Sequence, residues 1–380
     1  MRLALLLFKY FPYGGLQRDF LAIAGALRQR GCDCRVYCLD WQGELPEGLD
    51  LRRISVGALS NHVRYRRFLE RVRSDLAADP VDGTVGFNKM PGLDVYFAAD
   101  PCFADKLAGR GWWYRHLPRA RHFADWERAV FDADGATRIL LLSDIQRERF
   151  AHYYGTPAER LISLPAGVLP DRAYPDDASD RRRAARASLG VEPGELVLLS
   201  LGSGFATKGL DRTIDALAEI RRQQPAQSLR LLVAGEDKPG HFRRRVKKLG
   251  LADSVSFLGG RDDVVDLMLA ADLLVHPARA EAAGVVLLEA LVMGLPAVVT
   301  DNCGHAHHVS AARAGLVLPS PFSESDYTRA IMRFFDGVFR AECRESAQLY
   351  TRLTDLRSMH AFAADMIRQI VDSRMAADRD

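Results

Sequence analysis

Two glutamates stand eight positions apart in the second half of the chain, at Glu281 and Glu289. Glu289 is the only charged residue in 282–299, so its carboxylate needs a bonding partner if that segment is buried. The two hydroxyl groups of a ribose would supply donors for it. Gly284 precedes the helix expected to carry Glu289, and the free N–H groups at such a helix start can bind phosphate oxygens. The alternative is a glutamate paired with a distant arginine.

A lysine follows a glycine-rich loop in the segment LVLLSLGSGFATKGLDRTI. Gly202 and Gly204 come directly after an apolar run, and Lys208 lies just before a helical pattern. A cationic side chain over such a loop is typical of a diphosphate site, although in a P-loop a serine or threonine would follow the lysine directly. The alternative is an ordinary loop with an exposed lysine.

A third candidate lies near the N-terminus, where Gly14 and Gly15 open a helix in the segment FKYFPYGGLQRDF. Paired glycines let a backbone approach a ligand, and the helix start favours an anion. Asp19 shares a helix face with Gly15, so it either contacts that ligand or is simply a carboxylate stabilised by the helix dipole. Asp40 lies where a dinucleotide fold has its ribose-binding acid, but the missing G-x-G-x-x-G spacing argues against a NAD-dependent oxidoreductase.

A regular framework must position these residues, because short apolar runs alternate with helical patterns along the whole chain. This rhythm predicts an α/β protein with mainly parallel sheets covered by helices. Strands are expected near residues 2–8, 34–39, 51–56, 83–87, 95–99 and 138–142, and again near 196–201, 231–234, 255–258, 273–276, 297–300 and 315–318. The segment LPAGVLPDRAYP separates the two series. We therefore expect domains at 1–166 and 167–355, and a helix within 356–380 that could pack back across the first domain.

The composition is that of a globular protein, with 48% hydrophobic and 27% charged residues in a chain of 380. A chain of this length usually forms two domains. The net charge of +3 is too small to indicate nucleic-acid binding. No run approaches the roughly 18 to 20 apolar residues of a membrane span, and no cleavage site follows the opening MRLALLLF. We expect a cytoplasmic protein.

Two groups of residues contain possible metal ligands. The six cysteines lack paired CxxC spacing and the density of a disulfide scaffold, so we expect reduced thiols rather than a zinc site. His305, His307 and His308 form a cluster without the further donors that a metal site needs. We expect them to line a sugar pocket or to cap a helix, and we expect no metal.

A basic and aromatic segment lies between residues 103 and 131, with six cations against three acids and with three of the four tryptophans. This mixture is typical of a contact with an anionic bilayer. The residues expected at such a surface are Lys106, Arg110, Trp112, Trp113, Tyr114, Arg115, Arg119 and Arg121. The alternative is a pair of helices whose aromatic side chains are core and whose arginines are solvated.

Several runs resemble a known family: KYFPYGGLQRDF, VGFNKMPGLDVYFAAD, AADLLVHPARAEAAGVVLLEA and CGHAHHV. With the Glu281 and Glu289 spacing and the Lys208 loop, they resemble the retaining GT-B glycosyltransferases of family 4, and among these the bacterial lipopolysaccharide core glucosyltransferases. The resemblance spans residues 1 to about 355. It implies two Rossmann-like domains facing a central cleft, the first for the acceptor and the second for a nucleotide sugar.

The resemblance also implies an activity, which is transfer of a hexose, most simply glucose, from a UDP-sugar to the second heptose of the lipopolysaccharide inner core. The linkage would be α-1,3, the configuration would be retained, and no metal or other cofactor would be needed. The acceptor would place the enzyme on the inner face of the cytoplasmic membrane. The residues leave two alternatives open: another donor such as UDP-N-acetylgalactosamine, and a non-catalytic, membrane-associated binder of nucleotide sugars.

The resemblance assigns roles to single residues. Glu289 would hold the ribose, Lys208 and Arg172 would neutralise the diphosphate, and Glu281 would contact the donor hexose. The catalytic set is Asp19, Asp100, Lys208 and Glu281. The donor-binding set is Gly14, Gly15, Arg172, Gly202, Lys208, Arg261, Glu281, Ala282, Ala283, Gly284, Val285 and Glu289. Arg261 is included because Thr207 stands where relatives have a basic residue before the lysine.

Overall fold

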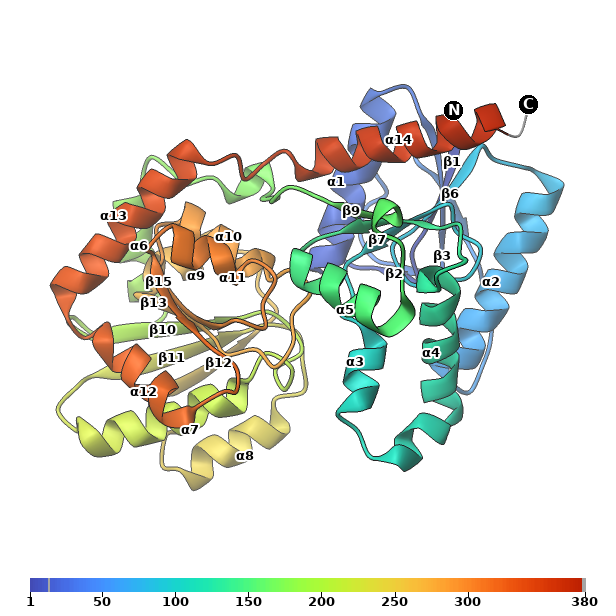
Figure 1. Ribbon diagram of the computed structural model, residues 1–380. Coiled ribbons are helices and arrows are strands. Elements are labelled where there is room, and N and C mark those ends of the chain that lie inside the picture. The colour runs from blue at the N-terminus through green and yellow to red at the C-terminus, as the bar shows by residue number, and fades with distance from the viewer. Residues whose placement is uncertain (13, 378–380) are drawn as a thin grey trace. The chain divides into compact units, whose positions relative to one another are not determined.

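The computed structural model describes residues 1–12 and 14–377. Two compact units make up the chain: Met1–Pro165 with Ser358–Asp380, and Ala166–Arg357. Each unit is built on a parallel sheet with helices along it, as the alternating pattern predicts (Figure 1). The predicted fold class, α/β with two Rossmann-like parallel sheets, is confirmed.

The sheet of the first unit has seven parallel strands in the order β5-β3-β1-β6-β7-β8-β9. They are β1 (Arg2–Leu6), β3 (Asp33–Cys38), β5 (Asp50–Arg53), β6 (Gly83–Gly86), β7 (Val95–Ala98), β8 (Arg138–Leu141) and β9 (Leu161–Ser163). All except β9 were predicted, with ends that agree to within about three residues. A separate two-stranded sheet pairs β2 (Lys9–Tyr10) with β4 (Asp40–Trp41), and neither strand was predicted.

The helices of the first unit include the one that closes the chain. They are α1 (Gly15–Gln29), α2 (Asn61–Ala78), α3 (Phe103–Ala108), α4 (Pro118–Phe131), α5 (Asp144–Tyr154) and α14 (Met359–Ala377), with short 3-10 helices η1 (Trp112–His116) and η2 (Ala158–Arg160). Helix α1 buries Phe20, Ile23, Ala24 and Leu27, which recur at the spacing of one helix face. Helix α14 runs beside α1, so the last helix belongs to the first unit (Figure 1).

The sheet of the second unit has six parallel strands in the order β12-β11-β10-β13-β14-β15. They are β10 (Leu196–Leu201), β11 (Leu229–Ala234), β12 (Val255–Gly259), β13 (Leu273–His276), β14 (Ala297–Thr300) and β15 (Gly315–Leu318), and all six were predicted. The order changes direction between β10 and β13, so the loops after these neighbouring strands lead away to opposite sides. A crevice for a ligand forms at the carboxyl ends of the strands at such a switch point.

The second unit contains eight helices and one 3-10 turn. They are η3 (Pro170–Arg172), α6 (Ala178–Ser188), α7 (Leu210–Gln223), α8 (Gly240–Lys248), α9 (Val264–Ala270), α10 (Val285–Val292), α11 (Ala306–Ala311), α12 (Glu324–Arg333) and α13 (Gly337–Leu353). Helix α10 is hydrophobic almost all round and lies among buried residues of the core, which leaves Glu289 as its one charged side chain.

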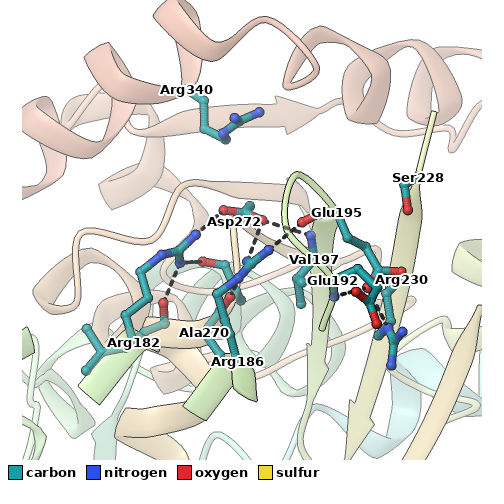
Figure 2. A network of polar contacts seen from close by, with 12 residues as sticks. Arg182, Arg186, Glu192, Glu195, Val197, Ser228, Arg230, Ala270, Asp272 and Arg340 are labelled. Carbon is teal, nitrogen blue, oxygen red and sulfur yellow. Dashed lines mark hydrogen bonds and ion pairs between the residues drawn. The ribbon is translucent and has the colours of Figure 1, made fainter. Parts of the chain in front are cut away.

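An ion-pair network fastens helix α6 to the amino-terminal edge of this sheet (Figure 2). Asp272, immediately before β13, accepts hydrogen bonds from Arg182 at 2.6 Å and from Arg186 at 3.2 Å. Glu195, immediately before β10, pairs with Arg230 at 3.0 Å. Burial alone would raise the pKa of the Asp272 carboxyl, but the two arginines hold it below its usual value. This network lies at the edge opposite the carboxyl ends of the strands, so its role is structural.

Candidate active site

Lys208 and Glu281 meet at the switch point of the second sheet. Lys208 comes from the loop after β10 and Glu281 from the loop after β13, and Lys208 Nζ lies 2.7 Å from Glu281 Oε2. His276, the last residue of β13, is buried with its Nε2 3.5 Å from the same carboxylate oxygen. Burial alone would raise the pKa of Glu281, but Lys208 and His276 outweigh it and hold the pKa at about 2. Glu281 is therefore an ionised acid paired with a cation.

Glycines make room for this lysine. Gly202 has φ +114, and a Cβ there would lie 2.9 Å from Lys208 Cε. Gly209 has φ +75, and a Cβ there would lie 2.1 Å from the Pro277 carbonyl oxygen. Larger residues would be strained at both positions, so the loop after β10 can hold Lys208 at the end of the strand only with these glycines.

Arg172 and Glu289 form a second pair in the same unit. Arg172 Nε donates to Glu289 Oε1 at 3.1 Å, and the two side chains are 11% and 13% exposed. The alternative of a glutamate paired with a distant arginine is thus part of the structure, since the two residues are 117 positions apart. Arg172 is itself one of the cations assigned to the diphosphate. The pair is therefore compatible with both interpretations of Glu289, as a ribose ligand and as the partner of a distant arginine, and it does not distinguish them.

Helix α10 begins as the sequence predicts. Gly284 precedes it with φ +78, and the helix runs from Val285. The preceding loop is joined to the segment after β14: His305 N donates to the Ala283 carbonyl at 2.7 Å, and Gly304 N donates to the Glu281 carbonyl at 3.3 Å. Ala282 and Ala283 are buried. The loop that presents Glu281 is thus fixed by backbone hydrogen bonds to a neighbouring segment.

The histidine cluster lies at the end of that segment. His305 stands just before α11, but its side chain makes no capping hydrogen bond. It is buried, and within residues 1–12 and 14–377 neither of its ring nitrogens has a hydrogen-bond partner. Burial, followed by the neighbouring His308 and His307, lowers its pKa to about 3. His308 instead contacts Tyr350 through Nδ1 at 2.7 Å.

Arg261, the third cation of the donor-binding set, forms an ion pair with a nearby aspartate. Arg261 follows β12 and pairs with Asp263, its Nε lying 2.7 Å from Asp263 Oδ1. The Arg261 pair is exposed and follows β12, which is an edge strand of the sheet. Lys208 follows β10, a central strand that is separated from β12 by β11.

In the first unit, the paired glycines follow β1 at the switch point between β1 and β6. Helix α1 starts at Gly15, and Gly14 precedes it. Asp19 is buried one turn into the helix, where its Oδ1 lies 2.9 Å from Nε2 of His360 on α14. Asp40 bonds Arg64 through both oxygens at 3.2 Å and lies 3.5 Å from Lys9. A ribose would have to displace those cations, which agrees with the argument against NAD.

Asp100 is an exposed residue two positions after β7. The adjoining loop is tied down by Glu127 of α4, a buried glutamate that the motifs above do not include. Glu127 accepts hydrogen bonds from the Phe103 and Ala104 amides at 2.7 and 2.8 Å, and it pairs with Lys89. The sequence did carry a signal for it, because Glu127 precedes the buried Val130 and Phe131 at the spacing of one helix face.

The basic and aromatic segment is largely exposed. It spans α3, η1 and the start of α4, and Trp112 and Trp113 are 76% and 59% exposed. Tyr114 is partly buried, whereas the segment's expected surface cations, Lys106, Arg110, Arg115, Arg119 and Arg121, are all exposed. Trp126 is core, 6.3 Å from Phe8 between ring centroids. The interpretation as core thus applies to Trp126, whereas the residues expected at a bilayer are mostly exposed, and contact with a bilayer stays a prediction. No helix among the described residues has the length and apolarity to cross a bilayer.

The cysteines and the other possible metal ligands were predicted to form neither disulfides nor a metal site. All six cysteines are buried and form no disulfide. In the described ranges, no group of three or more His, Cys, Asp or Glu side chains is arranged to hold a metal ion.

Comparison with known proteins now gives the class. Residues 181–350, most of the second unit, match the family model of Glycosyl transferases group 1. The HepE protein of Anabaena in complex with UDP-glucose superposes with a TM-score of 0.73 over 99% of this chain and 100% of that one, and its 18% identity makes this a likeness of fold. Fold and site therefore define a nucleotide-sugar-dependent glycosyltransferase.

The relatives narrow this class. The chain is 42% identical to the lipopolysaccharide glucosyltransferase WaaG of Escherichia coli (strain K12), over 97% of this chain and 98% of that protein. A crystal structure of WaaG superposes with a TM-score of 0.92 over 96% of this chain and 99% of that one. A D-inositol 3-phosphate glycosyltransferase of Catenulispora acidiphila is 31% identical over 65% of this chain and 60% of its own length. The chain belongs to the WaaG family of glycosyltransferases.

Proposed function

We propose that this protein transfers glucose from UDP-glucose to the second heptose of the lipopolysaccharide inner core, forming an α-1,3 linkage with retention of configuration. The similarity to WaaG over nearly the whole chain supports the substrate class. The observation that carries the chemistry is the pair of Lys208 and Glu281, 2.7 Å apart at the switch point of the second sheet. A fixed cation and a fixed carboxylate at that place suit a ligand with phosphates and hydroxyl groups.

The charges that develop during transfer account for the cations. When the bond between the sugar C1 and the phosphate breaks, negative charge builds up on the departing UDP. Lys208 and Arg172 are positive groups held by partly buried contacts, so they can stabilise that charge without reorganising solvent. The helix start at Val285 adds free N–H groups. These groups supply the positive charge without a divalent ion, and we propose that the reaction is independent of metal.

The two pairs also suggest how the donor enters. In the structure each cation bonds a glutamate, Lys208 with Glu281 and Arg172 with Glu289. A bound diphosphate would take over the cations, and the released carboxylates would accept hydrogen bonds from the hexose and ribose hydroxyls. Each charged group would thus exchange one partner for another and would never be left buried alone.

The decisive experiment measures transfer from UDP-glucose to lipopolysaccharide truncated after the inner-core heptoses. We expect turnover that continues in EDTA and a product whose new linkage is α-1,3 by NMR. A panel of UDP-sugars that includes UDP-N-acetylgalactosamine tests the donor. Faster transfer of another hexose would replace glucose in the proposal. If no donor is turned over and Glu281→Ala leaves nucleotide-sugar binding intact, the protein is a binder and the proposal is wrong.

We also propose that the enzyme works at the inner face of the cytoplasmic membrane, with the segment from Lys106 to Arg121 against anionic lipid. Two exposed tryptophans among exposed cations support this, because aromatic rings and basic side chains act together at an anionic interface. The test is co-sedimentation with phosphatidylglycerol vesicles at low salt. Trp112→Ser with Trp113→Ser should reduce binding, whereas Leu349→Ser with Leu353→Ser, at exposed sites on α13, should not. Wild-type protein that stays in the supernatant would exclude this arrangement.

A further inference from the structure

The last helix of the chain forms one wall of the first unit. Helix α14 turns Met359, His360, Ala363, Ala364, Ile367 and Val371 inward. It is anchored to the end of α1 by Arg30, which bonds both oxygens of Asp365 at 2.6 and 2.8 Å. Figure 1 shows α14 lying alongside α1. Most of the inward side chains are apolar, so the histidine among them needs a separate explanation.

That histidine bonds a carboxylate. His360 Nε2 lies 2.9 Å from Asp19 Oδ1, and the two residues are 8% and 6% exposed. When Asp19 is ionised, Nε2 must carry the proton of this hydrogen bond. Burial raises the pKa of Asp19, and His360, followed by Arg18, opposes that rise. The contact therefore fixes both the orientation of the carboxylate and the proton on the imidazole.

The position of Asp19 gives the contact a meaning beyond packing. Asp19 lies four residues after Gly15, on the first turns of the helix that follows β1. Strand β1 borders β6 where the order of the first sheet changes direction, which is where a parallel sheet binds its ligand. A carboxylate accepts several hydrogen bonds, so Asp19 can bond a substrate hydroxyl while it holds His360.

We propose that His360 is a positioning residue, which holds Asp19 in the orientation that its substrate contact requires. The last helix, distant in sequence, thereby completes the site of the first unit. This inference rests on the proposed glycosyl transfer. The competing explanation is that the pair only anchors α14 on α1, as Arg30 and Asp365 do.

Two amide variants of His360 distinguish these explanations, because their side chains differ mainly in length. In His360→Gln the side-chain nitrogen can take the place of Nε2 and still donate to Asp19. In His360→Asn the nitrogen corresponds to Nδ1 and falls short of Asp19. Asp365→Ala is the matched control, since it loosens the same helix without touching Asp19. For each variant, kcat and KM for glucose transfer and the Tm are measured.

We expect His360→Asn to lower kcat at least tenfold, and His360→Gln and Asp365→Ala to stay within threefold of wild type. In an Asp19→Asn background, His360→Asn should cause no further loss. The acid limb of the kcat profile should move to higher pH in His360→Asn, because loss of the His360 hydrogen bond raises the pKa of Asp19 further, against the effect of Arg18. Anchoring alone would move Tm but not this limb.

The inference is overturned if His360→Asn and Asp365→Ala lower kcat equally at equal Tm shifts, or if the losses from Asp19→Asn and His360→Asn multiply. A fully active Asp19→Asn would also overturn it. Should His360→Asn not fold, His360→Phe takes its place, because it keeps a ring in the buried position but has no donor for Asp19. The positioning role then requires the same loss of kcat and the same shift of the acid limb to higher pH, and an unshifted limb contradicts it. Failure of the proposed function looks different: wild-type protein would transfer no glucose at all.

Discussion

Replacing Glu289 with glutamine should have opposite effects on two ligands. If Glu289 occupies Arg172 until the donor arrives, removal of its charge makes the arginine attract an anion more strongly, with Asp171 still 3.5 Å away. Inorganic pyrophosphate, which has no ribose, should then bind more tightly to Glu289→Gln than to wild type. UDP-glucose should bind less tightly, because the variant loses the carboxylate proposed for the ribose.

The size of each effect follows from the geometry. A phosphate bound to Arg172 would lie roughly 6 Å from the Glu289 carboxylate, where two like charges repel by about 1 to 3 kcal/mol at effective dielectric constants of about 20 to 60. Loss of that repulsion should increase pyrophosphate affinity about tenfold. Each hydrogen bond from a ribose hydroxyl to a carboxylate contributes about 1.5 to 3 kcal/mol. Glutamine keeps one acceptor oxygen but no charge, so it loses one of two such bonds and weakens the other. This loss exceeds the electrostatic gain, and UDP-glucose affinity should fall about tenfold.

The assay is isothermal titration calorimetry of both ligands in EDTA at constant ionic strength. Glu195→Gln is the matched control, because Glu195 also pairs with an arginine in the second unit, at 3.0 Å, but at the opposite edge of the sheet (Figure 2). It should change neither affinity. If Glu289→Gln leaves UDP-glucose binding unchanged and does not strengthen pyrophosphate binding, the pair is an internal ion pair and the donor-exchange reasoning fails.

Three further outcomes are expected. Lys208→Met should lower kcat/KM for glucose transfer by about 10² to 10³, the usual effect of removing one group that stabilises a transition-state charge, while Lys247→Met on the exposed face of α8 should not. The pKa of Glu281 is lowered from 4.5 to about 2, so its contribution to stability, about 3 kcal/mol, is complete above pH about 4.5 and is lost as the pH falls toward 2; acid unfolding of Glu281→Gln should be correspondingly less steep. Glu127→Ala should lower the free energy of unfolding in urea by about 3 to 5 kcal/mol, because it removes the acceptor of two amides and the carboxylate paired with Lys89, which keeps only a neutral acceptor in the Pro101 carbonyl.

The sheets could be predicted because their strands carry the signal in themselves. In a parallel sheet covered on both faces, each strand is a short apolar run, and LVLLSL at 196–201 and LLVH at 273–276 are buried throughout. The strands that were missed lack this signal. Strand β9 has three residues at the sheet edge, and β2 and β4 have two residues each. Short edge strands are specified by their neighbours, which a local pattern does not contain.

The candidate site could be predicted in its residue types but not in its pairings. Lys208 and Glu281 stood out because glycines precede the lysine and an apolar helix follows the glutamate. Lys208 and Glu281 bond each other because β10 and β13 are neighbours in the sheet, although the two residues are 73 positions apart in the sequence. Asp19 and His360 are 341 positions apart. No periodicity extends over such separations, so only the strand order and the return of α14 reveal these contacts.

The two ion pairs of the candidate site affect which ligands can bind there. Four charged side chains, each less than a quarter exposed, would be costly if any one stood alone. A free phosphate can take over a lysine or an arginine, but its one or two P–OH groups cannot reach both glutamates that the cations release. A nucleotide sugar brings phosphates for the cations and hydroxyl donors for the carboxylates in one molecule. The same two pairs, in which each cation is matched by a carboxylate, would therefore discriminate against inorganic phosphate, although the cations alone would attract both ligands.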